Sequence, residues 1–322
     1  MDHHRPKSDA PPRDPWLAYF ADRGHTGAHR IGAGSEGVVY RLGGGRAAKV
    51  WSGRPPAGLD LTRQVYADLA RRRLPFATPE IFDVEDHEGV LVTYERELPG
   101  DPMRVDSAHA DYERELPAGQ SEALLAVLRG LASVPGTEAM RRLTVQGDDR
   151  PLWRDHDSFR EALADLVRRA AARHGGALAA CVPDFGAGVE RTRAALLALP
   201  DAPVTAIHGD LVPPNIHTDA AGRPVAVLDF GFCTTAGDPA FEAAVTAAIW
   251  DMYGPHAEEH TAELTGLFAE ELGYPPATLA TYRTAYALTT YDLFGLDEGD
   301  GHFRWCAQQL RHSPVFRGTR SG

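Results

Sequence analysis

Short runs of β-branched and aromatic residues, separated by glycine-rich turns, fill much of the first hundred residues. The runs cover residues 29–34, 37–43, 46–51 and 80–95. The first three predict strands, and the fourth predicts a hairpin with Glu88-Gly89 near its turn. Apolar residues at positions 61, 65 and 69 follow a helical period instead. This region therefore predicts a small antiparallel sheet with one inserted helix.

Beyond residue 102 the hydrophobic period becomes mostly helical. Residues 121–134, 157–175, 189–200, 239–253, 258–273, 276–294 and 300–312 predict helices, and a strand pair at 203–210 and 223–230 interrupts them. We expect a disordered segment at 1–14, which is polar and proline-rich, and a β-rich N-terminal lobe at 15–95. A hinge at 96–102 and a larger helical C-terminal lobe at 103–322 complete the predicted organisation.

Charge and composition exclude several classes of protein. The chain has 322 residues and a net charge of −12, which argues against a nucleic-acid binder because phosphate binding needs a basic face. No apolar run is long enough to predict a membrane span, and the N-terminus lacks the apolar core of a signal peptide. The three cysteines are widely spaced and predict neither a disulfide framework nor a zinc ribbon. We expect a cytoplasmic protein, and the sequence leaves its oligomeric state open.

The first chemical motif is a glycine triplet followed by a lysine. Gly32, Gly34 and Gly37, with Val39, form G-x-G-x-x-G-x-V. The triplet leads into a strand, so it predicts a hairpin loop and not a dinucleotide-binding turn, which would lead into a helix. Such a loop can lay backbone N–H groups over phosphates. Lys49 lies on the next strand, in a chain whose basic residues are almost all arginine. It suits a point contact with phosphate, and a solvated strand lysine is the alternative.

The second motif is H-x-D-x-x-x-x-N, formed by His208, Asp210 and Asn215. Two prolines within it predict an extended loop that leaves a strand, not a helical turn. A rival interpretation is the two-His, one-carboxylate site of non-haem iron oxygenases, with His256 or His302 as the second imidazole. That site belongs to β-barrels, whereas the chain after residue 239 predicts helices. It also leaves Asn215 and the glycine loop without a role. His208 is expected to fix the loop, and His217 to lie at the surface or behind the site.

The third motif is Asp229 at the end of an apolar strand, followed by Phe230 and Gly231. A hairpin between Asn215 and Asp229 would bring these two side chains close together. Their oxygen atoms suit magnesium held jointly with phosphates. Asp238, which follows soon after, is expected to be the N-cap of a helix with Pro239 at its first position.

Together the three motifs, in this order, resemble the protein-kinase-like phosphotransferases, and within them the aminoglycoside phosphotransferase family. The H-G-D sequence, Val212 where Ser/Thr kinases carry a lysine, and the short distance from D-F-G to the next helix favour that small-molecule branch. The resemblance implies an α+β, bilobal, protein-kinase-like fold.

The resemblance also implies roles for individual residues. Asp210 would be the catalytic base, and Asn215 and Asp229 would bind Mg²⁺. The implied contacts to ATP, or to GTP as the alternative donor, are Gly32, Gly34, Ser35, Gly37, Val39, Lys49, Thr93, Glu95 and Glu97.

One departure from the family pattern concerns the partner of Lys49. Kinases usually pair this lysine with a glutamate on the inserted helix, and the helix here has none. Asp60 or Asp68 could substitute, Gln64 could make a neutral contact, or the partner could come from elsewhere.

The acceptor is the least defined part of the prediction. Asp292, Asp297, Glu298 and Asp300 form an acidic cluster that could bind the amines of a cationic, hydroxyl-bearing acceptor, and a solvated loop is the alternative. An aminoglycoside or another amine-bearing antibiotic is the expected acceptor, which would make the protein a resistance enzyme. A kinase of choline-like, amino-alcohol or sugar metabolites is a second possibility. A nucleotide-binding pseudokinase without turnover is a third.

Overall fold

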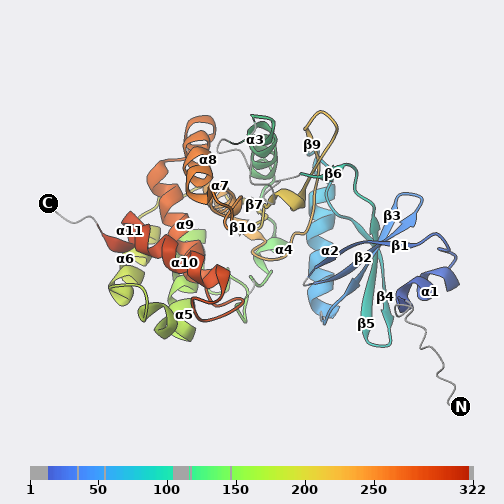
Figure 1. Ribbon diagram of the computed structural model, residues 1–322, viewed down its shortest axis with the longest axis horizontal. Coiled ribbons are helices and arrows are strands. Elements are labelled where there is room, and N and C mark those ends of the chain that lie inside the picture. The colour runs from blue at the N-terminus through green and yellow to red at the C-terminus, as the bar shows by residue number, and fades with distance from the viewer. Residues whose placement is uncertain are drawn as a thin grey trace, which may run out of the picture. The chain divides into compact units, whose positions relative to one another are not determined.

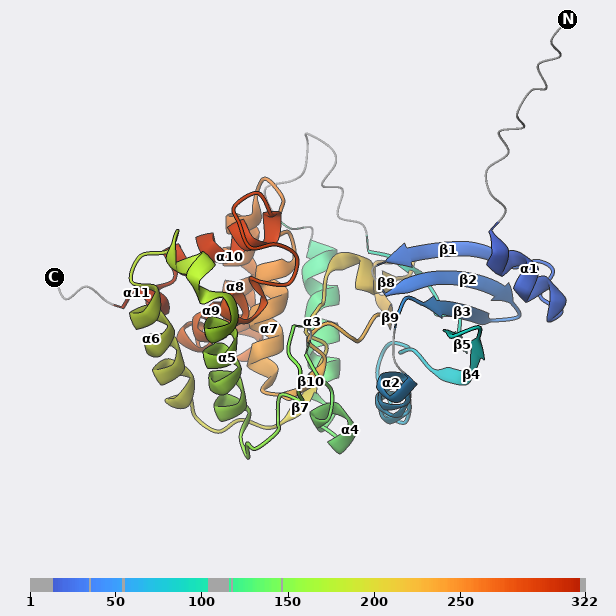
Figure 2. The same cartoon turned by 90° about the horizontal axis from the view of Figure 1, so that it is seen from below.

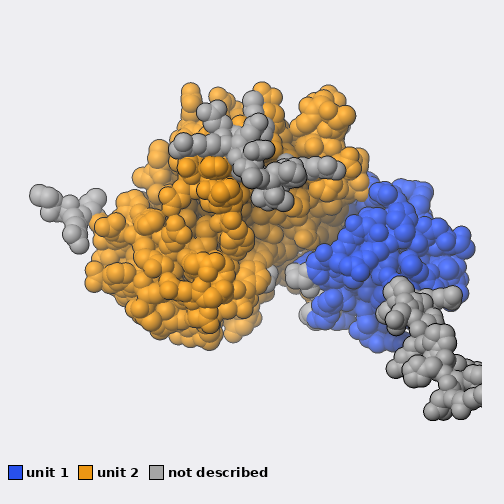
Figure 3. All heavy atoms as spheres, viewed as in Figure 1, with its two compact units in different colours: residues 1–56, 80–97 blue, residues 57–79, 98–322 orange. Residues whose placement is uncertain are grey.

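The computed structural model describes residues 14–34, 36–53, 56–103, 116, 118–145 and 147–318. Ser35 and residues 1–13 of the expected disordered segment lie outside these ranges. The chain forms two compact units (Figure 3). Unit 1 comprises the chain up to Pro56 together with Glu80–Glu97, and unit 2 comprises Ala57–Pro79 and Leu98–Gly322.

Unit 1 is built on a five-stranded antiparallel sheet, as the strand pattern predicted (Figure 1). Its strands are β1 (His29–Gly34), β2 (Gly37–Gly43), β3 (Arg46–Trp51), β4 (Ile81–His87) and β5 (Val90–Arg96), in the order β1-β2-β3-β5-β4. The turn between β4 and β5 has Glu88 at φ 54° and Gly89 at φ 84°. Two successive residues with positive φ are typical of the tight turns that match the twist of a hairpin.

The core of unit 1 lies on one face of this sheet. The register places Tyr40 beside Ala48, and Ala48 beside Tyr94, so alternate residues of three strands share that face. Helix α1 (Pro15–Asp22) contributes Tyr19 and Phe20 to the same cluster. Residues at the intervening positions, Lys49 among them, therefore belong to the opposite face.

Unit 2 is mostly helical. Its helices are α2 (Pro56–Ala70), α3 (Ala118–Ala132), α4 (Glu138–Arg141), α5 (Phe159–Ala179), α6 (Phe185–Leu197), α7 (Pro239–Ile249), α8 (Ala257–Leu272), α9 (Pro276–Thr290), α10 (Gly301–His312) and α11 (Pro314–Arg317). Helices α5, α6 and α9 pack against one another, as Figures 1 and 2 both show. The predicted helices are confirmed, whereas α4 and α11, of one turn each, were not predicted. No helix in the described ranges is long and apolar enough to cross a membrane.

Among the short strands of unit 2, the predicted hairpin between Asn215 and Asp229 is confirmed, whereas the partner of the strand at 203–210 differs from the prediction. Strand β7 (Thr205–Ile207) pairs with β10 (Thr235–Gly237), and β9 (Pro224–Val227) pairs with β8 (Ile216–Thr218). The expected pairing of residues 203–210 with 223–230 is therefore wrong. A short turn places β8 beside one edge of β9. Ala226 of β9 also forms an isolated β-bridge with Ala77. On its other side β8 pairs with β6 (Asp101–Pro102), so the end of the predicted hinge joins this small sheet.

Candidate active site

The loop from His208 to Asn215 connects β7 to β8. Val212 has extended backbone angles, as its position before a proline requires. Pro213–Asn215, however, form one turn of 3-10 helix, closed by a 2.9 Å hydrogen bond from the Asn215 N–H to the Val212 carbonyl. The prediction of a wholly extended loop is therefore wrong at this point. The fixed φ of proline suits the first position of a helical turn as well as an extended chain.

His208 is fully buried, and both of its ring nitrogens contact the backbone. Nε2 lies 2.7 Å from the Leu228 carbonyl oxygen, and the Asp210 N–H donates to Nδ1 at 3.2 Å. Burial lowers the pKa of His208 to about 4, so the ring is neutral at physiological pH. It donates from Nε2 and accepts at Nδ1, which confirms the predicted supporting role. Both nitrogens that could bind iron are already engaged, and the described residues contain no group of three potential metal ligands.

Two hydrogen bonds that involve the backbone link the segments of Asp210, Asn215 and Asp229. The side-chain amide of Asn215 donates to the Asp210 carbonyl at 2.9 Å, and the Leu228 N–H donates to the Asn215 carbonyl at 2.9 Å. The second bond continues the β8–β9 hairpin, so Asp229 follows directly after the residue that pairs with Asn215. Because the Asn215 nitrogen is bound to the backbone, its oxygen is the atom that can face a cation. An amide oxygen and a carboxylate are a donor set that magnesium accepts.

Two backbone positions at the site have left-handed angles. Asp229 has φ 61°, a conformation that Asp and Asn adopt more readily than other residues with a side chain. Gly209 has φ 76°, and a Cβ at this position would lie 2.5 Å from the Cβ of Cys233. The segment after β9 thus passes directly over Gly209, which explains why glycine separates His208 from Asp210.

Glu242, in the first turn of α7, binds the backbone of the loop from His208 to Asn215 and was not predicted. Its carboxylate accepts hydrogen bonds from the backbone N–H groups of His208 and Gly209, the latter at 3.0 Å. The side chain is 2% exposed, and burial raises its pKa to about 7 although these two N–H donors oppose the shift. All residues of α7 from Ala240 to Ile249 are buried. A single acid in an otherwise apolar helix was the signal that could have revealed it.

Three of the predicted nucleotide contacts lie side by side on the sheet of unit 1. Lys49 is the register partner of Val39 on β2 and of Thr93 on β5. The Lys49 ammonium lies 2.8 Å from a carboxylate oxygen of Glu36, in the glycine-rich hairpin, and 4.0 Å from the centre of the Trp51 ring. One partner of the lysine, which the sequence left open, is therefore an acid of the hairpin itself.

The other predicted nucleotide contacts differ in their surroundings. Gly32, Gly34 and Gly37 lie at the β1–β2 hairpin, with Gly34 and Gly37 as register partners. Glu95 accepts a 2.5 Å hydrogen bond from the Thr93 hydroxyl, and Glu97 forms a 2.6 Å ion pair with Arg41. Contact of Glu95 and Glu97 with the nucleotide stays a prediction.

The acidic loop predicted to bind the acceptor has partners within unit 2. Asp292 lies 3.2 Å from Arg173 and its side chain is 5% exposed, while Asp300 caps α10 by accepting from the Phe303 N–H. Asp297 accepts from the Gly299 N–H at 2.8 Å, and Glu298 lies 3.2 Å from Arg311. These contacts give each acid a structural role, and its role in acceptor binding stays a prediction.

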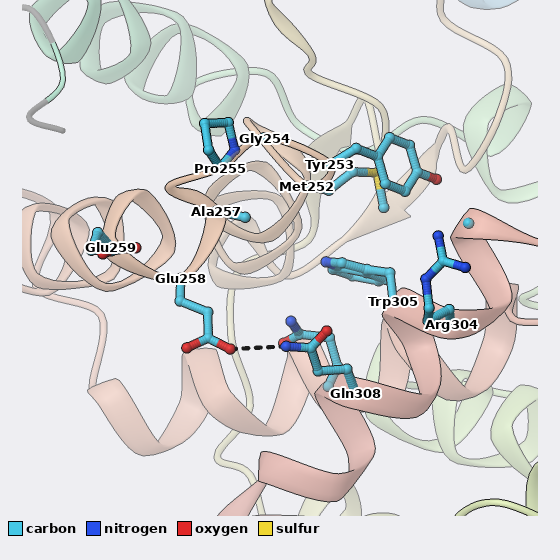
Figure 4. A pocket seen from close by; sticks show the side chains of 12 residues that line it. Met252, Tyr253, Gly254, Pro255, Ala257, Glu258, Glu259, Arg304, Trp305 and Gln308 are labelled. Atoms are coloured by element: carbon cyan, nitrogen blue, oxygen red, sulfur yellow. Dashed lines mark hydrogen bonds between the residues drawn. The ribbon is translucent and has the colours of Figure 1, made fainter. Parts of the chain in front are cut away.

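A cavity of about 400 Å³ lies beside this loop, between the segment that follows α7 and the helix α10 (Figure 4). Its lining combines Met252, Tyr253 and Trp305 with the polar side chains of Glu258, Glu259 and Gln308. The Glu258 carboxylate accepts a 3.0 Å hydrogen bond from Gln308, which Figure 4 marks. The cavity thus offers an aromatic wall and carboxylates within one space.

Tyr286 of α9 lies behind the wall of this cavity. Its ring contacts that of Trp305 edge to face, with 6.2 Å between the ring centres. Burial raises the pKa of Tyr286 well above its ordinary value, and the neighbouring Cys233 and Asp210 raise it further. Tyr286 therefore lies within electrostatic range of Asp210 and in contact with the cavity wall.

Solved structures with the same fold include several phosphotransferases. A macrolide 2'-phosphotransferase of type I is 22% identical, with a TM-score of 0.57 over 92% of this chain and 96% of that one. The GDP and kanamycin complex of an APH(2'') protein is 14% identical, with a TM-score of 0.59 over 90% and 92%. An aminoglycoside phosphotransferase from Streptomyces rimosus, in complex with ADP and streptomycin, is 19% identical, with a TM-score of 0.54 over 85% and 97%.

At these identities the likeness shows a kinase-like phosphotransferase fold and nothing finer. No curated protein sequence matches the chain. The model of the phosphotransferase enzyme family, APH, matches residues 27–288, which carry the glycine-rich hairpin, Lys49, the loop from His208 to Asn215 and Asp229. The chain therefore belongs to the aminoglycoside phosphotransferase (APH) family of phosphotransferase enzymes.

Proposed function

We propose that the protein transfers the γ-phosphoryl group of ATP to a hydroxyl group of a small molecule. The observation that carries the proposal is the connected arrangement of Asp210, Asn215 and Asp229, built by two backbone-anchored hydrogen bonds. Phosphoryl transfer needs positioning and charge neutralisation more than covalent chemistry, and these residue types supply both. GTP is the alternative donor, since the solved relatives include complexes with GDP as well as with ADP.

Each residue then has a defined task. The Asp210 carboxylate orients the acceptor hydroxyl and accepts its proton. The oxygen of Asn215 and the carboxylate of Asp229 would hold Mg²⁺, which neutralises the charge of the phosphates when it is bound. Lys49 and the backbone of residues 32–37 bind the phosphates in unit 1. His208 and Glu242 fix the backbone around Asp210 through hydrogen bonds.

The acceptor that we propose is an amine-bearing compound with an apolar surface. The cavity next to α10 supports this class, because Trp305 and Tyr253 can cover an apolar face while Glu258 and Glu259 attract protonated amines. Aminoglycosides and other amine-bearing antibiotics have this chemistry, and kanamycin and streptomycin are bound by two of the solved relatives. Choline-like or amino-alcohol metabolites would fit the same description.

Two measurements test the proposal. A thermal-shift titration with ATP and Mg²⁺ measures nucleotide binding, which should raise the melting temperature. Incubation with ATP, Mg²⁺ and pooled antibiotics and metabolites, followed by mass spectrometry, should show one compound that gains a phosphoryl group. Binding without transfer to any compound of a broad panel would favour the pseudokinase, and the absence of nucleotide binding would reject both functions.

A further inference from the structure

The ion pair between Glu36 and Lys49 joins strand β3 to the hairpin that the proposed function assigns to the nucleotide phosphates. The ammonium and carboxylate are 2.8 Å apart, and the two side chains are 14% and 37% exposed. Lys49 is thus largely enclosed, while Glu36 has solvent on one side. The carboxylate reaches the ammonium from the glycine-rich loop and not from a helix.

The backbone of the hairpin holds Glu36 in place. Its carbonyl accepts a 2.8 Å hydrogen bond from the Ser52 N–H, just after β3. At the next residue, a Cβ on Gly37 would lie only 2.0 Å from the Val50 carbonyl oxygen, so the hairpin is seated directly on β3. The backbone of Glu36 is therefore fixed beside Lys49, and a rotation of the side chain can carry the carboxylate away from the ammonium.

Phosphates and a carboxylate cannot both occupy this position favourably. A nucleoside triphosphate brings several negative charges to the same ammonium, and like charges within a few ångströms repel each other. Lys49 keeps a second contact when the carboxylate leaves, because its ammonium lies 4.0 Å from the centre of the Trp51 ring. The lysine can therefore stay in position while Glu36 turns towards solvent.

We infer that Glu36 competes with the nucleotide phosphates for Lys49: it pairs with the ammonium in the nucleotide-free protein and is displaced when a triphosphate binds. The inference rests on the proposed function, since it needs a nucleotide on this hairpin. It makes Glu36 a determinant of nucleotide affinity and assigns it no part in the chemical step. The protein would then bind triphosphate less tightly than its lysine alone would allow.

The test compares Glu36→Gln with the wild-type protein by isothermal titration calorimetry. The substitution keeps the shape of the side chain and removes its charge. ATP with Mg²⁺ should bind about three- to tenfold more tightly, as expected for release of a partly exposed ion pair and of its repulsion towards phosphate. Adenosine, which has no phosphate, should bind equally to both proteins. Glu88→Gln removes the same charge from an exposed turn of unit 1 and should change neither affinity.

Each other outcome has a distinct meaning. Unchanged or weaker ATP binding by Glu36→Gln, with a melting temperature like that of the wild type, would overturn the inference. Weaker binding would indicate that Glu36 orients Lys49 as the helix glutamate does in kinases. In either case ATP binding by the wild-type protein would leave the proposed function standing. If the wild-type protein bound no nucleotide, the proposed function and this inference would fall together.

Discussion

The loop from His208 to Asn215 in unit 2 and the glycine-rich hairpin of unit 1 hold their charged groups in opposite ways. In the loop, the backbone around Asp210 is fixed by buried groups: His208 is 0% exposed and Glu242 is 2% exposed. Beside the hairpin, Lys49 of β3 is paired with Glu36, whose side chain is more than a third exposed. The first region is built to keep one geometry, whereas the second can exchange one anion for another.

The two regions also differ in the free energy that is lost when a charged group is removed. Loss of a buried acceptor leaves N–H groups without a partner and costs about 1–3 kcal/mol for each group. A partly exposed ion pair contributes about 0.2–1 kcal/mol. Substitutions in the loop should therefore reduce turnover or stability, whereas substitutions in the hairpin should mainly change nucleotide affinity. The predictions below test this contrast, from the largest expected effect to the smallest.

Asp210→Asn should have the largest effect on transfer. The amide has the shape of the carboxylate but cannot accept the proton of the acceptor hydroxyl, so kcat should fall about 10³-fold or more. ATP affinity, measured by calorimetry, should stay within about twofold, because the loop is held by backbone groups that the change does not touch. Turnover close to that of the wild type would remove Asp210 as the base.

Glu242→Gln should reduce both turnover and stability. The amide oxygen can take the place of the oxygen that accepts from both N–H groups, but the amide NH2 then faces the Gly209 N–H, which lies 3.3 Å from the second carboxylate oxygen. We expect the free energy of unfolding to fall by about 1–3 kcal/mol. We also expect kcat to fall by about 10–100-fold, since small shifts of a catalytic group are costly. Glu270→Gln, at an exposed position of α8, removes the same charge and serves as the control. Full activity in Glu242→Gln would show that the loop holds its shape without this acceptor.

The same residue gives the loop a pH dependence. Because burial raises the pKa of Glu242 from 4.5 to about 7, the folded protein binds more protons than the unfolded chain between these values. The contribution of Glu242 to stability is therefore full below pH 4.5 and is lost as the pH rises through 7. Between pH 5 and pH 8, urea unfolding should show the wild type losing on the order of 3 kcal/mol relative to Glu242→Gln. A difference that is constant with pH would contradict the raised pKa.

Asp229→Asn tests the proposed metal ligand with little disturbance of the backbone. Asn tolerates the φ of 61° that Asp229 adopts, so the loss of charge is the main change. Binding of ATP should weaken at least about tenfold in the presence of Mg²⁺, a loss seen even for residues that only support a metal ligand. Binding measured without Mg²⁺ should change little. Equal affinities with Mg²⁺ for the two proteins would exclude Asp229 as a ligand.

Much of the fold could be predicted because hydrophobic periodicity and motif order are local properties of the chain. The hairpin that joins Asn215 to Asp229 follows from two apolar runs and a polar turn. The pairing of β7 with β10 could not be predicted, since β10 has three residues and its partner lies far back in the chain. The contacts of Glu36 and Glu242 depend on sheet register and on helix packing. Neither can be deduced from residue type alone.

The smallest expected effect concerns the acceptor. The double substitution Glu258→Gln and Glu259→Gln should raise the KM of a cationic acceptor by about three- to tenfold, with kcat unchanged, because each exposed carboxylate contributes little. Asp297→Asn with Glu298→Gln removes the same charge from the neighbouring acidic loop, whose two carboxylates are not among the residues that line the cavity, and should change KM less. The reverse order would assign the acceptor to that loop, as the sequence alone predicted. No change in either variant would indicate that the acceptor carries no amine near these residues.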